Sequence, residues 1–123
     1  MNLFDECKIA LGKNFLIPDT QWVEECRNLI KLHSKLNYID FNELSDLKSF
    51  LILYEKECFC VFVDNSEIPV FSSKLFAIID NIYDILCLSN NVFFVNDSVI
   101  IKSLFPSFSL RVFMVFDSEL ESP

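Results

Sequence analysis

The residues most able to do chemistry in this chain are its single histidine and its five cysteines. A Cys–His pair could act as a nucleophile and base, but that mechanism needs a positioned partner for each group. His33 falls on the same helical stripe as Trp22, Cys26 and Leu29, which favours a core or partly buried histidine over a general base. The lone glycine, Gly12, also excludes a glycine-rich loop that would cradle phosphates. The sequence therefore predicts no catalytic site and no enzyme activity.

The cysteines do not have the spacing of a metal site. Cys58 and Cys60 would share one face of a strand, but a zinc site needs two further soft ligands, and the spacing offers none. An odd number of cysteines among apolar neighbours is typical of buried thiols in a reducing cytosol. We expect no metal and no cofactor. The positions are Cys7, Cys26, Cys58, Cys60 and Cys87.

Acidic side chains are the remaining candidates, because they outnumber basic ones by 18 to 10 and leave a net charge of −8. This charge disfavours nucleic acid as a partner, since cationic side chains supply most of the affinity for phosphates. It favours a basic protein partner, which an acidic surface attracts over long distances. Three groups are predicted to bind that partner: Asp40, Glu43 and Asp46; Asp64 and Glu67; and Asp80 and Asp84.

Each acidic group also has an ordinary structural explanation. Acids at the start of a helix complement its dipole. For Glu43 and Asp46, this explanation is as good as partner binding. Asp64 and Glu67 would flank a solvent-exposed turn. Asp80 and Asp84 would belong to the narrow polar face of an otherwise apolar helix. The acidity is uneven along the chain. Residues 1–57 hold ten acids and seven bases, whereas residues 58–123 hold eight acids and three bases.

The predicted secondary structure changes from mainly helices to mainly strands halfway along the chain. The first half is predicted to be mostly helical, with helices at 2–12, from about 19 or 20 to 36, and at 43–54. The second half predicts strands at 58–63, 68–71, 92–95 and 110–116, and one buried helix at 73–88. Pro69 should place its strand at a sheet edge. Residues 98–105 fit a strand or a helix equally well.

These elements predict a single α+β domain over residues 1–123, with a small, mainly antiparallel sheet and an acidic tail at 117–123 that frays. The apolar fraction is 52%, and strand 58–63 is apolar on both faces, so both sides of the sheet must be covered. A chain this short can also use a second copy or a partner protein for that purpose, so we expect either a homodimer through an apolar surface or a partner protein on that surface. No apolar stretch is long enough to span a membrane, and no signal peptide is apparent. The prediction is a cytoplasmic protein.

As a whole, this profile resembles the immunity proteins of contact-dependent growth inhibition systems. The resemblance includes the acidic clusters Asp40-x-x-Glu43-x-x-Asp46 and Asp80-x-x-x-Asp84. It implies a non-enzymatic protein that binds a cognate toxin domain, commonly a nuclease, and blocks its basic cleft with carboxylates. The alternative is a small acidic, dimeric secretion chaperone that holds an effector segment in apolar grooves.

Overall fold

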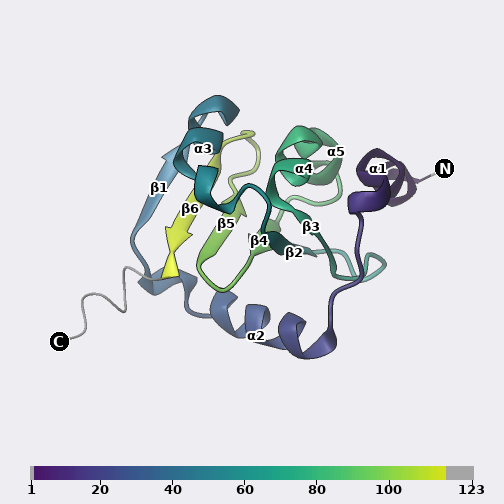
Figure 1. Ribbon diagram of the computed structural model, residues 1–123, viewed down its shortest axis with the longest axis horizontal. Coiled ribbons are helices and arrows are strands. Elements are labelled where there is room, and N and C mark those ends of the chain that lie inside the picture. The colour runs from purple at the N-terminus through teal and green to yellow at the C-terminus, as the bar shows by residue number, and fades with distance from the viewer. Residues whose placement is uncertain (1, 116–123) are drawn as a thin grey trace.

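A six-stranded antiparallel sheet forms the middle layer of the computed structural model, which describes residues 2–115 (Figure 1). The order of the strands across the sheet is β1-β6-β5-β4-β2-β3. Neighbouring strands are antiparallel at each of the five pairings. The strands are β1 (Tyr38–Phe41), β2 (Cys58–Val63), β3 (Phe71–Lys74), β4 (Val92–Val95), β5 (Val99–Ser103) and β6 (Leu110–Met114).

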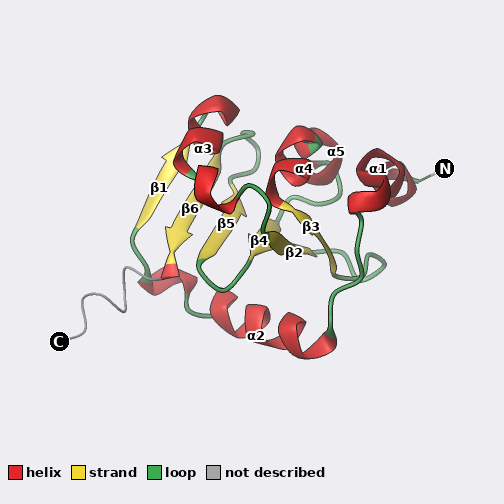
Figure 2. Ribbon diagram, in the orientation of Figure 1, coloured by secondary structure: helices red, strands yellow, loops and turns green. Residues whose placement is uncertain are grey.

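Helices cover both faces of this sheet, as the two-sided apolar strands required (Figure 2). One face carries α1 (Leu3–Leu11), α3 (Leu44–Phe50), α4 (Leu75–Asp80) and α5 (Ile82–Leu86), and the larger core cluster lies beneath them. The other face carries α2 (Thr20–Ile30) over a smaller cluster. In β2, Phe59 belongs to the first cluster and Cys60 to the second. The predicted α+β class and the two-sided burial of residues 58–63 are therefore confirmed.

The first two helices begin where their sequence signals place them. The Asn2 side chain accepts a hydrogen bond from the backbone N–H of Asp5, and the side chain of Asp19 does the same for Trp22. Gly12 ends α1 with a positive φ of 55°, a conformation that costs glycine nothing. The helix predicted from about residue 20 to 36 ends at Ile30, and His33–Lys35 forms a separate 3₁₀ turn.

Two predicted helices are interrupted in the structure. The helix expected over 43–54 is α3 followed by a 3₁₀ turn at Ile52–Tyr54. The single helix expected over 73–88 was wrong, because the chain divides into α4 and α5 at Asn81. The Asn81 side-chain amide donates to the carbonyl oxygen of Ala77 at 2.8 Å, four residues earlier. Such a bond from side chain to backbone competes with the regular helical ladder.

The return strand of the β2–β3 hairpin is shifted from its predicted position. Residues 68–71 were expected to pair, but β3 begins at Phe71, so Pro69 lies in the connecting loop. β3 does lie at one end of the strand order. Its outer side is joined by Leu16, which exchanges two backbone hydrogen bonds of 2.9 Å with Ser72. That short bridge covers an edge that would otherwise expose unpaired backbone groups.

Two further elements follow from the pairing of strands far apart in the chain. Residues 98–105, ambiguous in sequence, contain β5, which pairs with both β4 and β6. β1 was not predicted, and it pairs only with β6. The predicted frayed acidic tail at 117–123 lies outside the described residues. Within residues 2–115, no helix is both long and apolar enough to cross a membrane.

Candidate functional site

All seven acidic residues predicted to bind a partner are exposed, but two of them have basic neighbours. The guanidinium of Arg111 makes a two-pronged contact with Asp40, with Nε–Oδ1 and Nη2–Oδ2 distances of 2.7 and 3.0 Å. This hydrogen bonding lowers the pKa of Asp40. The ammonium of Lys48 on α3 lies 2.5 Å from a carboxylate oxygen of Asp80 on α4. Asp40 and Asp80 therefore carry part of the fold's internal charge pairing.

The two remaining acids of the first group lie at the start of α3. Glu43 is its N-cap residue, although its side chain makes no capping hydrogen bond, and Asp46 is in the first turn. Both side chains are exposed, and neither forms an ion pair within the described residues. Their position suits the helix dipole, and it leaves both carboxylates available to a partner.

The second acidic group belongs to the β2–β3 loop, which is tied to the segment after α5. The backbone N–H of Asp64 donates to the carbonyl oxygen of Asn91 at 3.1 Å. The Ser89 hydroxyl in turn donates to the carbonyl oxygen of Asp64 at 3.2 Å. Glu67, on the same loop, lines a hollow of about 450 Å³ together with Glu6 of α1. Folding therefore brings Glu6, from near the N-terminus, to the same hollow as Glu67.

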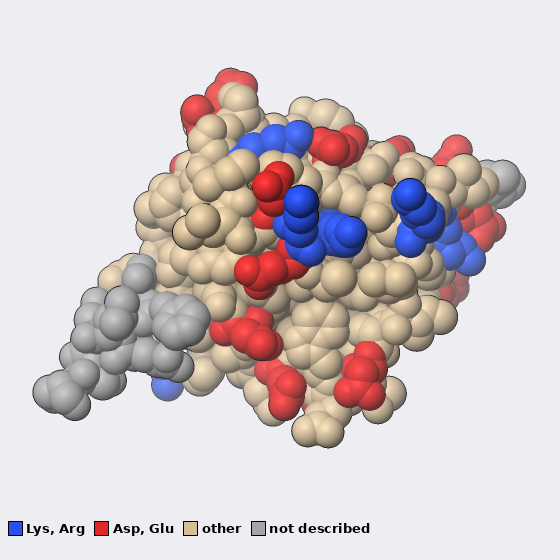
Figure 3. All heavy atoms as spheres, in the orientation of Figure 1, with Lys and Arg blue, Asp and Glu red and all other residues tan. Residues whose placement is uncertain are grey.

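Asp84 lies on α5, close enough to α1 for its charge to act on a thiol there. Burial, followed by the negative charge of Asp84, raises the pKa of the Cys7 thiol on α1 to about 11. Asp84 itself is exposed and forms no ion pair within residues 2–115. Figure 3 shows acidic side chains in several clusters, separated by neutral surface and by groups of Lys and Arg. On this face the acidic side chains do not form one continuous patch.

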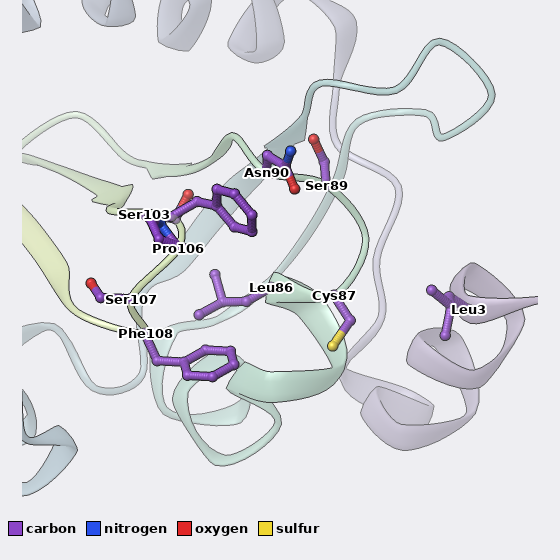
Figure 4. A pocket seen from close by; sticks show the side chains of 10 residues that line it. Leu3, Leu86, Cys87, Ser89, Asn90, Ser103, Pro106, Ser107 and Phe108 are labelled. Atoms are coloured by element: carbon purple, nitrogen blue, oxygen red, sulfur yellow. The ribbon is translucent and has the colours of Figure 1, made fainter.

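An apolar groove of about 400 Å³ lies near the second acidic group, and the sequence analysis missed it (Figure 4). Its walls come from the start of α1, the end of α5 with the following turn, and the loop between β5 and β6. A signal was present in the sequence, because Phe105 and Phe108 flank Pro106 and Ser107 in a short turn-like segment. The lining residues are Leu3, Leu86, Cys87, Ser89, Asn90, Ser103, Phe105, Pro106, Ser107 and Phe108.

The β5–β6 loop that carries these two phenylalanines is held by its own hydrogen bonds. Backbone N–H groups of Leu104 and Ser107 donate to the carbonyl oxygens of Ser109 and Leu104, each at 3.1 Å. The Ser107 hydroxyl also donates to the carbonyl oxygen of Leu104, and the Ser109 hydroxyl reaches the side chain of Asn42. The two aromatic rings are thus presented by an ordered turn.

His33 packs against two phenylalanine rings on the face of the sheet that α2 covers. Its ring makes edge contacts with Phe93 and Phe113, at centroid distances of 5.2 and 5.3 Å. The adjacent cleft is lined by Ser34, Leu36, Tyr38, Lys102, Arg111 and Phe113, with no cysteine or carboxylate among these residues. Within residues 2–115, no group of three His, Cys, Asp or Glu side chains is placed to hold a metal ion.

The cysteines differ sharply in environment, which predicts an order of thiol labelling. Cys87 is exposed, whereas Cys7, Cys26 and Cys60 are buried. A hydrogen bond with Cys26 and burial also raise the pKa of Cys60, and the thiolate is the reactive form. Under native conditions at pH 8, we expect iodoacetamide to modify Cys87 first, and the three buried thiols only after unfolding. Peptide mass spectrometry measures this order, and early modification of Cys7 or Cys60 would contradict the described packing.

Comparison with known proteins assigns the chain to a family. Residues 1–113 match the family model described as "CdiI immunity protein EcoliA0-like". A search of curated proteins finds no significant match. Because the family match spans nearly the whole chain, the resemblance predicted from the sequence profile is confirmed. The chain belongs to the CdiI immunity protein family and is a toxin-neutralising immunity protein.

Proposed function

We propose that this protein is a non-enzymatic inhibitor that acts in the cytoplasm on a cationic toxin domain with nuclease activity. Its carboxylates would occupy the positions where the toxin binds the phosphates of its substrate. A nuclease cleft must attract a polyanion, so it presents lysine and arginine side chains. An immunity protein with a net charge of −8 is electrostatically suited to such a cleft.

The observation that carries the proposal is the availability of the predicted carboxylates. Five of the seven are exposed and form no ion pair within residues 2–115, so binding a basic partner breaks no internal charge pair: Glu43, Asp46, Asp64, Glu67 and Asp84. Close charge pairs across an interface contribute about 1.5–7 kcal/mol in a well-measured nuclease–inhibitor complex. A few such pairs are enough to give nanomolar affinity.

The test uses the toxin domain encoded by the gene immediately upstream. Two variants remove charge without changing side-chain shape: Glu43→Gln with Asp46→Asn, and Asp64→Asn with Glu67→Gln and Asp84→Asn. Isothermal titration calorimetry between 50 and 300 mM NaCl gives the dissociation constant of each. We expect at least one variant to bind about 30-fold more weakly at 50 mM NaCl, because lost charge pairs across an interface cost several kcal/mol. Its salt dependence should also be shallower.

A matched control removes two acids elsewhere on the surface. Glu25 and Asp97 are exposed, and Glu25→Gln with Asp97→Asn should leave the affinity within about threefold of the parent protein, as a change in net charge alone would. Equal losses in the control and in both test variants would refute a specific acidic contact. A toxin domain that cleaves no RNA or DNA would refute the nuclease part of the proposal.

The secretion-chaperone alternative makes a different prediction for the same mixture. An inhibitor binds a folded toxin domain, whereas a chaperone dimer binds an extended segment. Analytical ultracentrifugation of the purified complex reports its stoichiometry, and near-UV circular dichroism reports whether the toxin remains folded. We expect one immunity protein for each folded toxin. A complex of two copies with an unfolded segment would support the chaperone and contradict the inhibitor.

A further inference from the structure

We propose that the apolar groove between α1, the end of α5 and the β5–β6 loop is the surface on which the toxin docks. The groove would receive an aliphatic or aromatic side chain of the toxin, flanked by lysine or arginine residues. This inference rests on the proposed function and adds to it the place and the chemistry of contact. It is carried by the exposed aromatic rings, the ordered loop and the charges around the groove.

Large apolar side chains gather at this groove in a way that folding does not require. Phe105 is 61% exposed, Phe108 is 58% exposed and Leu3 is 53% exposed. All three line the same cavity. Next to it, Tyr83 of α5 is 57% exposed and makes an edge contact with Phe108 at 5.1 Å. Clustered apolar groups that remain in water are characteristic of binding surfaces, because only a partner can bury them.

The groove is formed before any partner arrives. The hydrogen bonds of Leu104, Ser107 and Ser109 fix the loop that carries Phe105 and Phe108, and Tyr83 restrains the Phe108 ring from the α5 side. In Figure 4 the side chain of Phe108, on the β5–β6 loop, and that of Leu86, at the end of α5, point toward the same space. A preformed aromatic site loses little conformational entropy on binding, and it therefore suits an interface hot spot.

The surroundings of the groove determine which partner fits. Neither the groove nor the neighbouring hollow, with which it shares Leu3, has a lysine or arginine among its lining residues. The hollow contains Glu6 and Glu67, Ser89 of the groove holds the backbone of Asp64, and Asp84 follows Tyr83 on α5. The hollow beside the apolar center thus holds two carboxylates, and Asp64 and Asp84 belong to segments that contact residues of the groove. Carboxylates beside an apolar groove complement an apolar anchor that is flanked by cations.

The same charges argue against two other occupants. A second copy of this chain docking by the same face would bring these carboxylates toward their own equivalents, and like charges in contact cost several kcal/mol. A nucleic acid would bring phosphates to the same carboxylates. A standard interface buries about 800 Å² on each partner. The groove and the hollow are neighbours, since Leu3 lines both, so one partner can contact both of them.

The decisive variant replaces both exposed rings, Phe105→Ala with Phe108→Ala. Truncation of two hot-spot aromatics is expected to weaken binding of the upstream-encoded toxin domain at least 100-fold in calorimetry at 150 mM NaCl. The matched control is Phe50→Ala with Leu53→Ala, two exposed apolar residues on and beside α3, which should change the dissociation constant less than threefold. Melting temperatures and circular dichroism spectra confirm that both proteins are folded.

A second measurement uses the unaltered fold. Cys87 is exposed and lines the groove, so a bulky maleimide attached to it should block docking. We expect the labelled protein to bind at least 30-fold more weakly, and a Cys87→Ser protein treated in the same way to bind normally. Normal binding by both the labelled protein and the double phenylalanine variant would overturn the assignment of the groove.

These results separate failure of the docking surface from failure of the proposed mechanism. If the carboxylate variants weaken binding while the phenylalanine variant does not, the groove is wrong and the acidic mechanism stands. If the phenylalanine variant weakens binding while affinity is independent of salt, the groove stands and the acidic mechanism is wrong. Binding of DNA or RNA oligonucleotides to the immunity protein alone would contradict both.

Discussion

Replacing Phe94 by alanine is expected to lower the free energy of unfolding by about 3–5 kcal/mol, the range for truncation of a fully buried aromatic side chain. Phe94 is 1% exposed and lies in β4, opposite Val61 of β2 and Ile101 of β5. Its side chain belongs to the larger core cluster, which also contains Ile82 and Ile85 of α5. The cavity left by truncation would therefore weaken both the sheet and the helix that forms one wall of the groove.

Urea unfolding followed by the fluorescence of the single tryptophan, Trp22, measures this loss. Phe50→Ala is the control, because Phe50 is 42% exposed and has a ring contact with Phe41 at 5.2 Å. Its truncation should cost about 1 kcal/mol or less. Similar losses for the two variants would show that Phe94 is not in the core. At low temperature, the fraction of Phe94→Ala protein that remains folded should still bind toxin normally.

The second large effect is expected at Asn96, in the turn between β4 and β5. Its side-chain oxygen accepts hydrogen bonds from the backbone N–H groups of Ser98 and Val99, at 2.9 and 2.8 Å. Its amide nitrogen donates to a carboxylate oxygen of Glu57 at 3.2 Å. Asn96→Ala would leave the buried N–H of Val99 without a partner, so we expect a loss of about 2–3 kcal/mol in unfolding free energy.

A double variant that exchanges the amide and carboxylate groups of residues 96 and 57 provides the control for this turn. In the double variant Asn96→Asp with Glu57→Gln, the aspartate still accepts from the two backbone groups, and the glutamine amide donates to it. We expect this protein to lie within about 1 kcal/mol of the parent in the same urea experiment. A loss as large as that of Asn96→Ala would mean that these hydrogen bonds do not stabilise the turn.

The order and type of most elements could be predicted from local signals. Asn2 and Asp19 mark helix starts by capping, Gly12 marks an end, and the apolar run at 58–63 marks a doubly covered strand. These signals depend on interactions between residues a few positions apart, so they can be recognised in the sequence. The break at Asn81 was missed because its cause is a single hydrogen bond between the Asn81 side chain and Ala77, which the apolar periodicity obscures.

β1 was missed for a different reason. Tyr38, Ile39 and Asp40 are exposed, so no apolar alternation identifies this strand. It exists because β6 pairs with it and because Arg111 binds Asp40 from 71 residues away. The same contact gives one predicted carboxylate an ion pair within the chain, and Lys48 does so for Asp80. The exposure of all seven acids was predictable from their charge, whereas their ion pairing was not.

An acidic α+β domain with apolar strands covered on both faces could be predicted from the amino-acid sequence, because charge, capping and periodicity are properties of short stretches of chain. The sequence also indicated the family, through a profile that the family match confirmed. The folded structure was needed to show which carboxylates lack an ion pair among residues 2–115, and it brings Leu3, Cys87 and Phe105 to one groove. Leu3 is more than 80 residues from the other two in sequence, and the packing of α1, α5 and the β5–β6 loop brings them together.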